Sequence, residues 1–136
     1  MKEGIVFSDL DGTLIFHDDI HNLKKIKKNV RDKVIVKDLN NLKEYECYDV
    51  STNLYNVFFN VETREILKKL GEKYYIVIVT GARKSSVVNR RKVLDFADAF
   101  LIDNGGAVLT KNFNEDKVWK KMLKSERDVL DDFSKN

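Results

Sequence analysis

The chain has 136 residues, of which 43% are hydrophobic and 35% are charged. This length and balance are typical of one globular domain, so we expect a single domain over residues 1–136. The 25 Lys and Arg residues against 22 Asp and Glu give a net charge of +3, which is too small and too evenly mixed to indicate nucleic-acid binding.

No apolar run approaches the ~18 residues that a membrane span requires, and the first residues show no signal-peptide pattern. We therefore expect a cytoplasmic protein without a membrane partner. Cys47 is the one cysteine, which excludes an internal disulfide and favours a reducing compartment.

The first predicted element is a strand in the stretch GIVFSDLDGTL, residues 4–14. Its apolar run, Ile5 to Phe7, is typical of a strand that is buried on both faces. In an open parallel sheet, ligands bind in the crevice at the carboxyl ends of the strands. Because this run ends in Asp9 and Asp11, the two acids are candidate site residues.

Asp9 and Asp11 have the chemistry of a metal and substrate site. Side chains alternate along a strand, so both carboxylates face the same way if the backbone stays extended through Leu10. Two like charges this close need a divalent cation or a shared proton, and hard oxygen ligands suit Mg²⁺. Gly12 permits a sharp turn, which the Thr13 hydroxyl can fasten. The other interpretation is an ordinary surface turn, since Asp and Gly are common turn residues.

Two histidines follow this motif, His17 and His21, at a spacing that can bind a metal on a helix. Asp18 and Asp19 lie beside them in the sequence, but no further ligand completes a site. We therefore expect exposed polar side chains here.

The region up to residue 60 is predicted to be largely extended. Leu23, Ile26 and Val30 recur at helical spacing, which favours a short helix or a structured loop. The following stretches are rich in β-branched and aromatic residues and predict an antiparallel hairpin or meander, although they could also extend the main sheet. They are VIVKDL (34–39), KEYECYDVS (43–51) and NVFFNV (56–61).

A helix is predicted from Glu62 to Gly71, with Thr63 as its N-cap and an apolar face. That face contains Ile66, Leu67 and Leu70. The next stretch, residues 74–79, reads as a core strand. Strand, helix and strand in succession predict a right-handed parallel crossover.

Thr80, Gly81 and Arg83 follow this second core strand. A hydroxyl at a strand's carboxyl end, followed by Gly and a helix that opens near Ser85, can bind phosphate through the hydroxyl and backbone N–H groups. A helix-capping loop is the other interpretation of Thr80. For Arg83 we expect a phosphate or substrate contact at most.

The alternation of strands and helices continues, which is typical of an α/β protein. A helix is expected from about Ser85 to Leu94 and a strand over residues 99–102. The sequence DNGG at 103–106 requires an unusual backbone or a close approach, and a returning strand follows it. The tail, residues 110–136, has apolar residues at helical intervals from Asp116 to Phe133 and predicts an amphipathic C-terminal helix.

The motif FSDLDGTL resembles the first motif, DxDGT, of the haloacid dehalogenase (HAD) superfamily, and the strand that ends in Thr80 resembles the second. The Thr-Gly-x-Arg form is similar to sugar-phosphatase members, and LIDNGGAVL resembles an element of members whose cap is inserted after the second motif. The resemblance implies a three-layer Rossmann-like fold around a parallel sheet. It also implies that residues 15–60 are an enlarged β-hairpin flap.

The resemblance further implies a Mg²⁺-dependent phosphomonoester hydrolase with an aspartyl-phosphate intermediate. Asp9 would be the nucleophile and Asp11 the general acid and base, and both would hold Mg²⁺. Thr80, Gly81 and Arg83 would bind the phosphate. The implied substrate is a small phosphorylated metabolite, with a sugar phosphate suggested by Thr-Gly-x-Arg.

The chain departs from the family in its later motifs. A complete member continues with a Lys that neutralises the phosphate and with a strand that ends in further acids. Here Asp131 and Asp132 fall in a predicted helix, and the lysines at 111, 117, 120, 121 and 124 mark no strand end. We therefore expect one of three cases: part of a larger phosphatase, a chain that recruits groups from a second subunit, or a receiver-like module that binds phosphate or Mg²⁺ without turnover. Its oligomeric state stays open.

Overall fold

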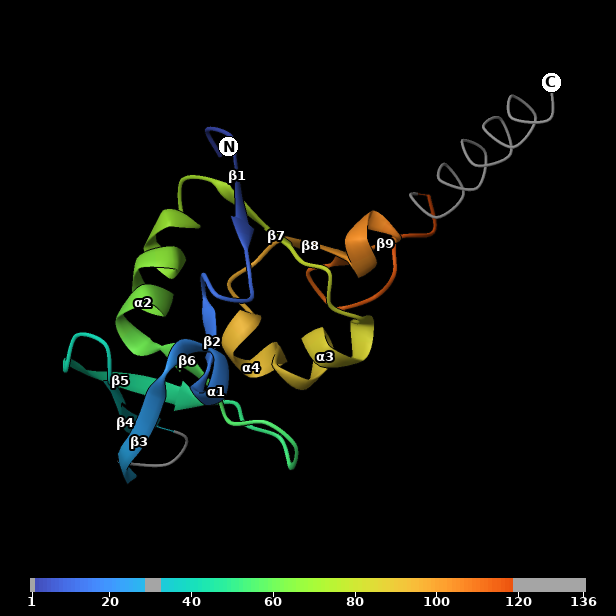
Figure 1. Ribbon diagram of the computed structural model, residues 1–136. Coiled ribbons are helices and arrows are strands. Elements are labelled where there is room, and N and C mark those ends of the chain that lie inside the picture. The colour runs from blue at the N-terminus through green and yellow to red at the C-terminus, as the bar shows by residue number, and fades with distance from the viewer. Residues whose placement is uncertain (1, 29–32, 119–136) are drawn as a thin grey trace, which may run out of the picture.

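The computed structural model describes residues 2–28 and 33–118, whose strands form two sheets with helices beside them, an α/β architecture (Figure 1). Sheet A is four-stranded, in the order β1-β7-β8-β9. Its strands are β1 (Ile5–Asp9), β7 (Tyr75–Val79), β8 (Ala99–Ile102) and β9 (Ala107–Thr110). Sheet B is five-stranded, in the order β2-β6-β5-β4-β3. Its strands are β2 (Ile15–His17), β3 (Leu23–Lys28), β4 (Lys33–Asp38), β5 (Glu44–Asp49) and β6 (Val57–Asn60).

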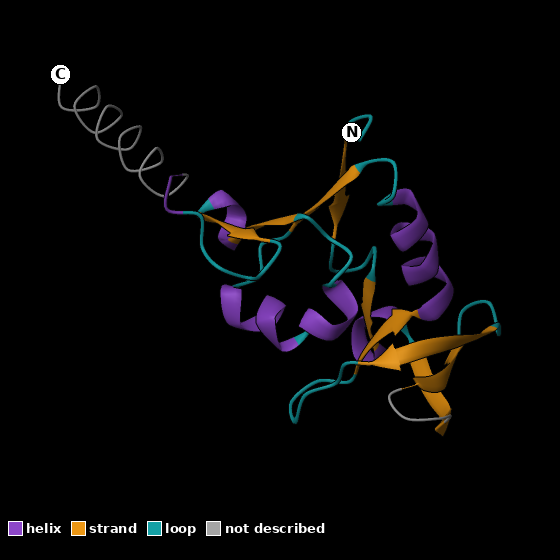
Figure 2. Cartoon of the chain, turned by 180° about the vertical axis from the view of Figure 1, so that it is seen from behind, coloured by secondary structure: helices purple, strands orange, loops and turns teal. Residues whose placement is uncertain are grey.

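The helices lie alongside the two sheets. Sheet A lies at one end of the molecule and sheet B at the other, with α2 beside both and α3 and α4 next to sheet A (Figures 1 and 2). The helices are α1 (Asp18–His21), α2 (Val61–Leu70), α3 (Lys84–Asn89), α4 (Arg91–Leu94) and the 3₁₀ helix η1 (Asp103–Gly105). None of the described helices has the length and apolar character needed to cross a membrane.

Sheet A contains the predicted parallel strands. β1 pairs in parallel with β7, and β7 pairs in parallel with β8, whereas β9 returns antiparallel to β8. Both connections, from β1 to β7 and from β7 to β8, therefore step in the same direction along the sheet. Right-handed crossovers that step in one direction place their helices on one face, and α2, α3 and α4 accordingly pack on the same side.

The main core lies between that face of sheet A, the helices and sheet B. From sheet A it includes Ile76, Ile78 and Phe100, which are fully buried. Sheet B contributes Ile15 and Phe59 to the same cluster. The two sheets thus share one hydrophobic core.

The other face of sheet A is open in the described part of the chain. Ile5 and Phe7 on β1 keep 57% and 62% of their surface exposed, and Tyr75 and Val79 on β7 are exposed beside them. The prediction that the first strand is buried on both faces is therefore wrong. Its cause is topological: β1 lies at the edge of the sheet, and no described helix covers this face.

Sheet B confirms the three predicted extended stretches as β4, β5 and β6, paired antiparallel. They form a separate sheet and do not extend sheet A. Helical spacing misled the prediction for Leu23 and Ile26, which lie on strand β3. The register of β3 against β4 shifts between Lys25 and Lys27, so Ile26 is the extra residue of a bulge and is exposed. Val30 lies outside the described residues.

Helix α2 is confirmed, with corrections to its cap and its buried face. The side chain of Asn60, rather than that of Thr63, is the cap, because it accepts a hydrogen bond from the Thr63 N–H at 3.1 Å. Ile66 is exposed, and Arg64 is buried instead. The Arg64 guanidinium donates to the Val93 carbonyl oxygen at 3.2 Å and ties α2 to α4.

The predicted crossover also needs correction. The strand before α2, β6, belongs to sheet B, while β7 after it belongs to sheet A. The parallel partner of β7 is β1, so the whole of sheet B is inserted in the connection from β1 to β7.

The remaining elements follow the prediction with local differences. The helix expected up to Leu94 is divided into α3 and α4 at Arg90. In the DNGG loop, Gly105 has φ +88°, and both Asp103 and Asn104 also lie in the left-handed region. Thr110 ends strand β9, so no helix starts there, and most of the predicted C-terminal helix lies outside the described residues.

Candidate functional site

The first part of the site is the acid loop, residues 9–13, at the carboxyl end of β1. Leu10 is fully buried and anchors the loop, while Asp9 and Asp11 on either side of it are exposed. The Leu10 carbonyl oxygen accepts the Leu14 N–H at 2.8 Å, and the Gly12 N–H donates to the Ile15 carbonyl oxygen at 2.7 Å. Gly12 has φ +77°, a conformation that most L residues avoid, so glycine is needed at this turn.

Asp9 is held by short-range contacts within the acid loop. Its Oδ1 atom accepts the Leu10 N–H at 2.9 Å, and its Oδ2 atom lies 3.5 Å from the Thr13 hydroxyl. Both contacts fix the carboxylate and leave it exposed to solvent. The arrangement suits a carboxylate that must reach a bound ligand.

Thr80 joins the acid loop from the neighbouring strand. Because Asp9 is paired in register with Val79, Thr80 emerges beside the acids at the same edge of sheet A. Its hydroxyl donates to Asp11 Oδ2 at 3.4 Å and accepts the Ala82 N–H at 3.1 Å. Thr80 is only 4% exposed, so this hydroxyl has a fixed place. The two predicted motifs thus lie side by side.

Gly81 and Arg83 lie next to Thr80 but have different surroundings. A Cβ atom on Gly81 would lie 2.7 Å from Asn104 Oδ1, so a side chain here would require the Asn104 side chain to move. That loop is tied to the same place by the Asp103 N–H, which donates to the Ala82 carbonyl oxygen at 2.8 Å. Arg83 is exposed at the start of α3, and no ion pair joins it to Asp9 or Asp11.

His17 is a site neighbour that the sequence prediction missed. Its Nε2 atom lies 3.6 Å from Asp11 Oδ1, and its side chain is only 18% exposed. The expectation of an exposed polar residue is therefore wrong for His17. Its backbone N–H donates to His21 Nδ1 at 2.8 Å, so the second histidine supports the first. The spacing of four residues did not indicate that β2 runs back beside the acids.

Arg90 is a second neighbour that no motif indicated. It lies at the break between α3 and α4. Partial burial lowers the pKa of its guanidinium, and the negative charge of Asp11 offsets part of this decrease. An arginine nevertheless stays protonated at neutral pH, so Arg90 adds a positive charge to the neighbourhood of Asp11.

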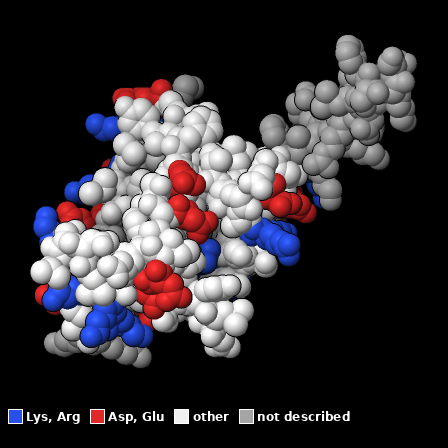
Figure 3. Space-filling view, in the orientation of Figure 1, with Lys and Arg blue, Asp and Glu red and all other residues white. Residues whose placement is uncertain are grey.

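The surface charge agrees with this arrangement. Acidic side chains gather near the middle of the viewed face, where β1 ends in Figure 1, and basic side chains are scattered mainly around the rim (Figure 3). A concentration of negative charge at the end of a strand attracts cations.

The donor set fits part of a magnesium site. The described residues contain no group of three or more His, Cys, Asp or Glu side chains that could hold a metal ion. However, Mg²⁺ in phosphate-handling sites is commonly held by one or two carboxylates, with waters and the substrate phosphate as its other ligands. Asp9 and Asp11 supply hard oxygen atoms of this kind.

Comparison with known proteins does not assign the chain. A search with protein-family models found no match, and a search of curated proteins found no similar sequence. The case for a function therefore rests on the residues and contacts of the chain itself.

Proposed function

We propose that this protein is a Mg²⁺-dependent phosphomonoester hydrolase of the HAD type, acting on a small phosphorylated metabolite. The observation that supports the proposal best is the hydrogen bond of 3.4 Å from the Thr80 hydroxyl to the Asp11 carboxylate. It brings together two motifs that are 69 residues apart in the sequence. An isolated surface turn after a strand would not require such a partner.

In the first step, a carboxylate oxygen of Asp9 attacks the phosphorus atom and the ester P–O bond breaks. Asp11 gives its proton to the departing alkoxide, which leaves as an alcohol. The hydroxyl of Thr80 and backbone N–H groups near Gly81 hold the phosphoryl oxygens. Arg83 is exposed and free to contact substrate from the rim of the site.

In the second step, Asp11 takes a proton from water, whose oxygen attacks the phosphorus of the aspartyl phosphate. The bond between Asp9 and phosphorus breaks. Inorganic phosphate is released, and the free Asp9 carboxylate is regenerated. His17 positions the Asp11 carboxyl group through the 3.6 Å contact, and Arg90 moderates its charge.

The proposed cation would be held by the carboxylate of Asp9 and the backbone carbonyl oxygen of Asp11, which leaves the Asp11 side chain free to carry the proton. Bound Mg²⁺ lowers the repulsion between the negative phosphate and the attacking carboxylate. The Lys and the further acids of a complete HAD member are not identified in this chain. A larger protein or a second subunit would supply them, together with strands and helices that complete a three-layer fold around sheet A.

Sheet B corresponds in this proposal to the enlarged flap over residues 15–60. The mixed and nearly neutral charge fits a metabolite enzyme of the cytoplasm better than a nucleic-acid-binding protein. A sugar phosphate is one candidate substrate, since Thr80, Gly81 and Arg83 have the Thr-Gly-x-Arg form.

The test is hydrolysis of 4-nitrophenyl phosphate with and without Mg²⁺. We expect activity that depends on Mg²⁺. Asp9→Asn and Asp11→Asn should each lower this activity by about 10³-fold or more, because the two acids act together in catalysis and the loss of either one stops the reaction. Thr80→Val is expected to lose about 10²-fold, because one oriented donor is removed. Asp19→Asn is the matched control, since Asp19 is an exposed acid on α1, and it should retain wild-type activity.

A non-catalytic module that binds phosphate or Mg²⁺ is the second candidate. It would need only the two acids and the Thr80 hydroxyl, which lie together at the end of sheet A, and no additional Lys or acid. Mg²⁺ binding measured by calorimetry, lost in Asp9→Asn but without hydrolysis by the wild type, would select this module. Hydrolysis that is unchanged by Asp9→Asn would eliminate the proposed mechanism.

A further inference from the structure

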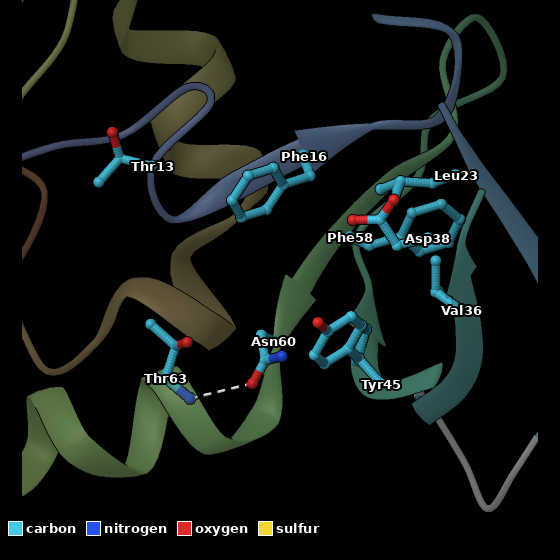
Figure 4. A pocket seen from close by; sticks show the side chains of 10 residues that line it. Thr13, Phe16, Leu23, Val36, Asp38, Tyr45, Phe58, Asn60 and Thr63 are labelled. Atoms are coloured by element: carbon cyan, nitrogen blue, oxygen red, sulfur yellow. Dashed lines mark hydrogen bonds between the residues drawn. The ribbon is translucent and has the colours of Figure 1, made fainter. Parts of the chain in front are cut away.

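Sheet B curls around a pocket of about 260 Å³ (Figure 4). Its walls come from strands β2 to β6 and from the first turn of α2. The apolar part is formed by Phe16, Leu23, Val36, Cys47 and Phe58. Val36, Cys47 and Phe58 belong to a small buried cluster of their own, so the pocket has a packed floor.

The pocket and the main core lie on opposite faces of the same strands. Ile15 and Phe59 point into the main core, whereas their neighbours Phe16 and Phe58 line the pocket. Because side chains alternate along a strand, every second residue of β2 and β6 is thereby available to a ligand. The pocket is thus formed by one face of sheet B and is separate from the main core on the other face.

The charge of the pocket indicates which ligand it accepts. Asp38 is the only one of its lining residues that carries a charge at neutral pH, since burial raises the pKa of the Cys47 thiol to about 12 and keeps it neutral. The Asp38 carboxylate is held in place by the Asn40 N–H, which donates to Oδ1 at 2.8 Å. One negative charge and no positive charge disfavour an anion in this pocket. They favour an apolar group with an ammonium or hydroxyl donor.

Thr13 connects the pocket to the acid loop. It lines one end of the pocket, across Phe16 from Asp38 and Leu23 (Figure 4). Its hydroxyl also lies 3.5 Å from Asp9 Oδ2. A ligand atom in van der Waals contact with Thr13 lies about 4 Å from that side chain. The Thr13 side chain alone then separates this ligand atom from the Asp9 carboxylate.

We propose that this pocket binds the organic part of the substrate, a compact and mostly apolar group with an ammonium or hydroxyl donor. This inference rests on the proposed phosphatase activity. A carboxylate that attacks phosphorus starts about 3–3.5 Å from it, and the ester oxygen and carbon atoms lie beyond the phosphorus atom. When the phosphorus atom of a phosphomonoester lies next to Asp9, its organic group is therefore far enough from Asp9 to reach the end of the pocket at Thr13.

The pocket volume of about 260 Å³ corresponds to roughly nine water molecules, because one molecule in liquid water occupies about 30 Å³. A six-membered ring with a short substituent has this size. Such a ring would pack on Phe16 and Phe58, while its donor group would bond to Asp38.

The test compares three substrates: 4-(2-aminoethyl)phenyl phosphate, phenyl phosphate and methyl phosphate. The wild type is expected to have a kcat/KM for the aminoethyl compound about tenfold or more above that for phenyl phosphate, because a charge-assisted bond to Asp38 is gained. Asp38→Asn keeps the size of the side chain and is expected to reduce this ratio to near one. Glu44→Gln is the matched control, since Glu44 is an exposed acid on β5 outside the pocket, and the ratio should not change.

A second variant tests the space of the pocket. Thr63→Phe adds bulk at a half-buried position at the start of α2 and is expected to lower the ratio of phenyl to methyl phosphate turnover by about tenfold. Ratios between substrates cancel any general loss of activity. If both variants keep the wild-type ratios, the pocket does not hold the organic group, and the inference is overturned.

Binding of tyramine, the aminoethyl compound without its phosphate, separates this inference from the proposed function. We expect tyramine to shift the amide NMR signals of Asp38 and Cys47, with tenfold weaker binding in Asp38→Asn. If the wild type hydrolyses none of the phosphates, the proposed function fails, while this binding still supports the ligand class. If tyramine leaves those signals unchanged, the ligand class is wrong whatever the hydrolysis assay gives.

Discussion

The two sheets of this protein bury their faces in different ways. Sheet A packs one face against helices and leaves Phe7 and Tyr75 exposed on the other. Sheet B packs Phe59 into the main core on one face and gathers Val36 and Phe58 into a cluster on the other. The antiparallel sheet B thus buries apolar side chains on both of its faces, whereas the mixed sheet A buries them on one face only.

The difference follows from how the strands are connected. Antiparallel strands joined by short turns can curl, so that a sheet covers itself without further elements. Parallel strands need crossover helices, and helices from crossovers that step in one direction all lie on one face. In sheet A both steps, to β7 and to β8, go the same way. Among the described elements, no helix therefore covers the second face, and its apolar side chains are exposed.

The largest expected effect is on the free energy of unfolding, and it distinguishes two adjacent residues that lie on opposite faces of β7. Ile78 is fully buried in the main core, and Val79 is exposed on the open face. Ile78→Ala is expected to lower the free energy of unfolding by about 2–5 kcal/mol, through lost burial and a new cavity. Val79→Ala should cost less than about 1 kcal/mol. Urea denaturation followed by circular dichroism measures both, and equal losses would show that the open face is in fact covered.

A smaller effect is expected within sheet B. Val36 is 1% exposed and belongs to the small cluster of this sheet. Val36→Ala is expected to cost about 1.5–3 kcal/mol, the value of burying one such side chain. Leu39→Ala, at an exposed position just after the same strand, is the control and should be close to neutral. If Val36→Ala is also neutral, the concave face of sheet B is not a packed region, and the contrast between the sheets disappears.

The pH dependence of stability sharpens the comparison further. The Cys47 thiol has a pKa of about 12 in the fold against 9.0 when unfolded, because burial disfavours the thiolate. Above pH 9 the unfolded chain binds fewer protons than the folded one, so Cys47 stabilises the fold fully below pH 9 and loses this contribution as the pH rises toward 12. Relative to Cys47→Ala, the wild type should lose up to about 1.4 kcal/mol per pH unit in that range. Parallel curves for the two proteins, measured with reductant from pH 8 to 10.5, would contradict burial of the thiol.

The smallest effect is expected on the open face. Phe7→Thr retains a residue that favours strands and should change the free energy of unfolding by less than about 0.5 kcal/mol. It should also reduce the fluorescence of a hydrophobic dye, because an exposed apolar surface is lost. A loss of stability comparable to that of Ile78→Ala would mean that Phe7 is buried in the protein in solution.

Much of the fold could be predicted from local patterns. Apolar runs that end in Asp9 and Thr80 located β1 and β7, since such runs depend on residues adjacent in the sequence. The strand β3 could not be predicted, because its bulge at Ile26 imitates helical spacing. The cap at Asn60 was missed because α2 begins at Val61, one residue before the start at Glu62 that the sequence pattern predicted.

The candidate site could be predicted only in its two motifs. The contact of Asp11 with Thr80 follows from the two motifs, because each motif ends one of two adjacent parallel strands. His17 and Arg90 depend on how β2 and the break after α3 fold back, which no short stretch of sequence specifies. The same holds for the pocket, because Thr13 and Asp38 line the same pocket only when sheet B curls.

The position of β1 has one more consequence. Among the described strands it is bonded to β7 alone, so the backbone amides and carbonyls along its outer side have no strand beside them. A strand supplied by another polypeptide could hydrogen-bond to this margin and extend the sheet past Asp9. Asp9 and Asp11 would then lie in the interior of a wider crevice with a second wall.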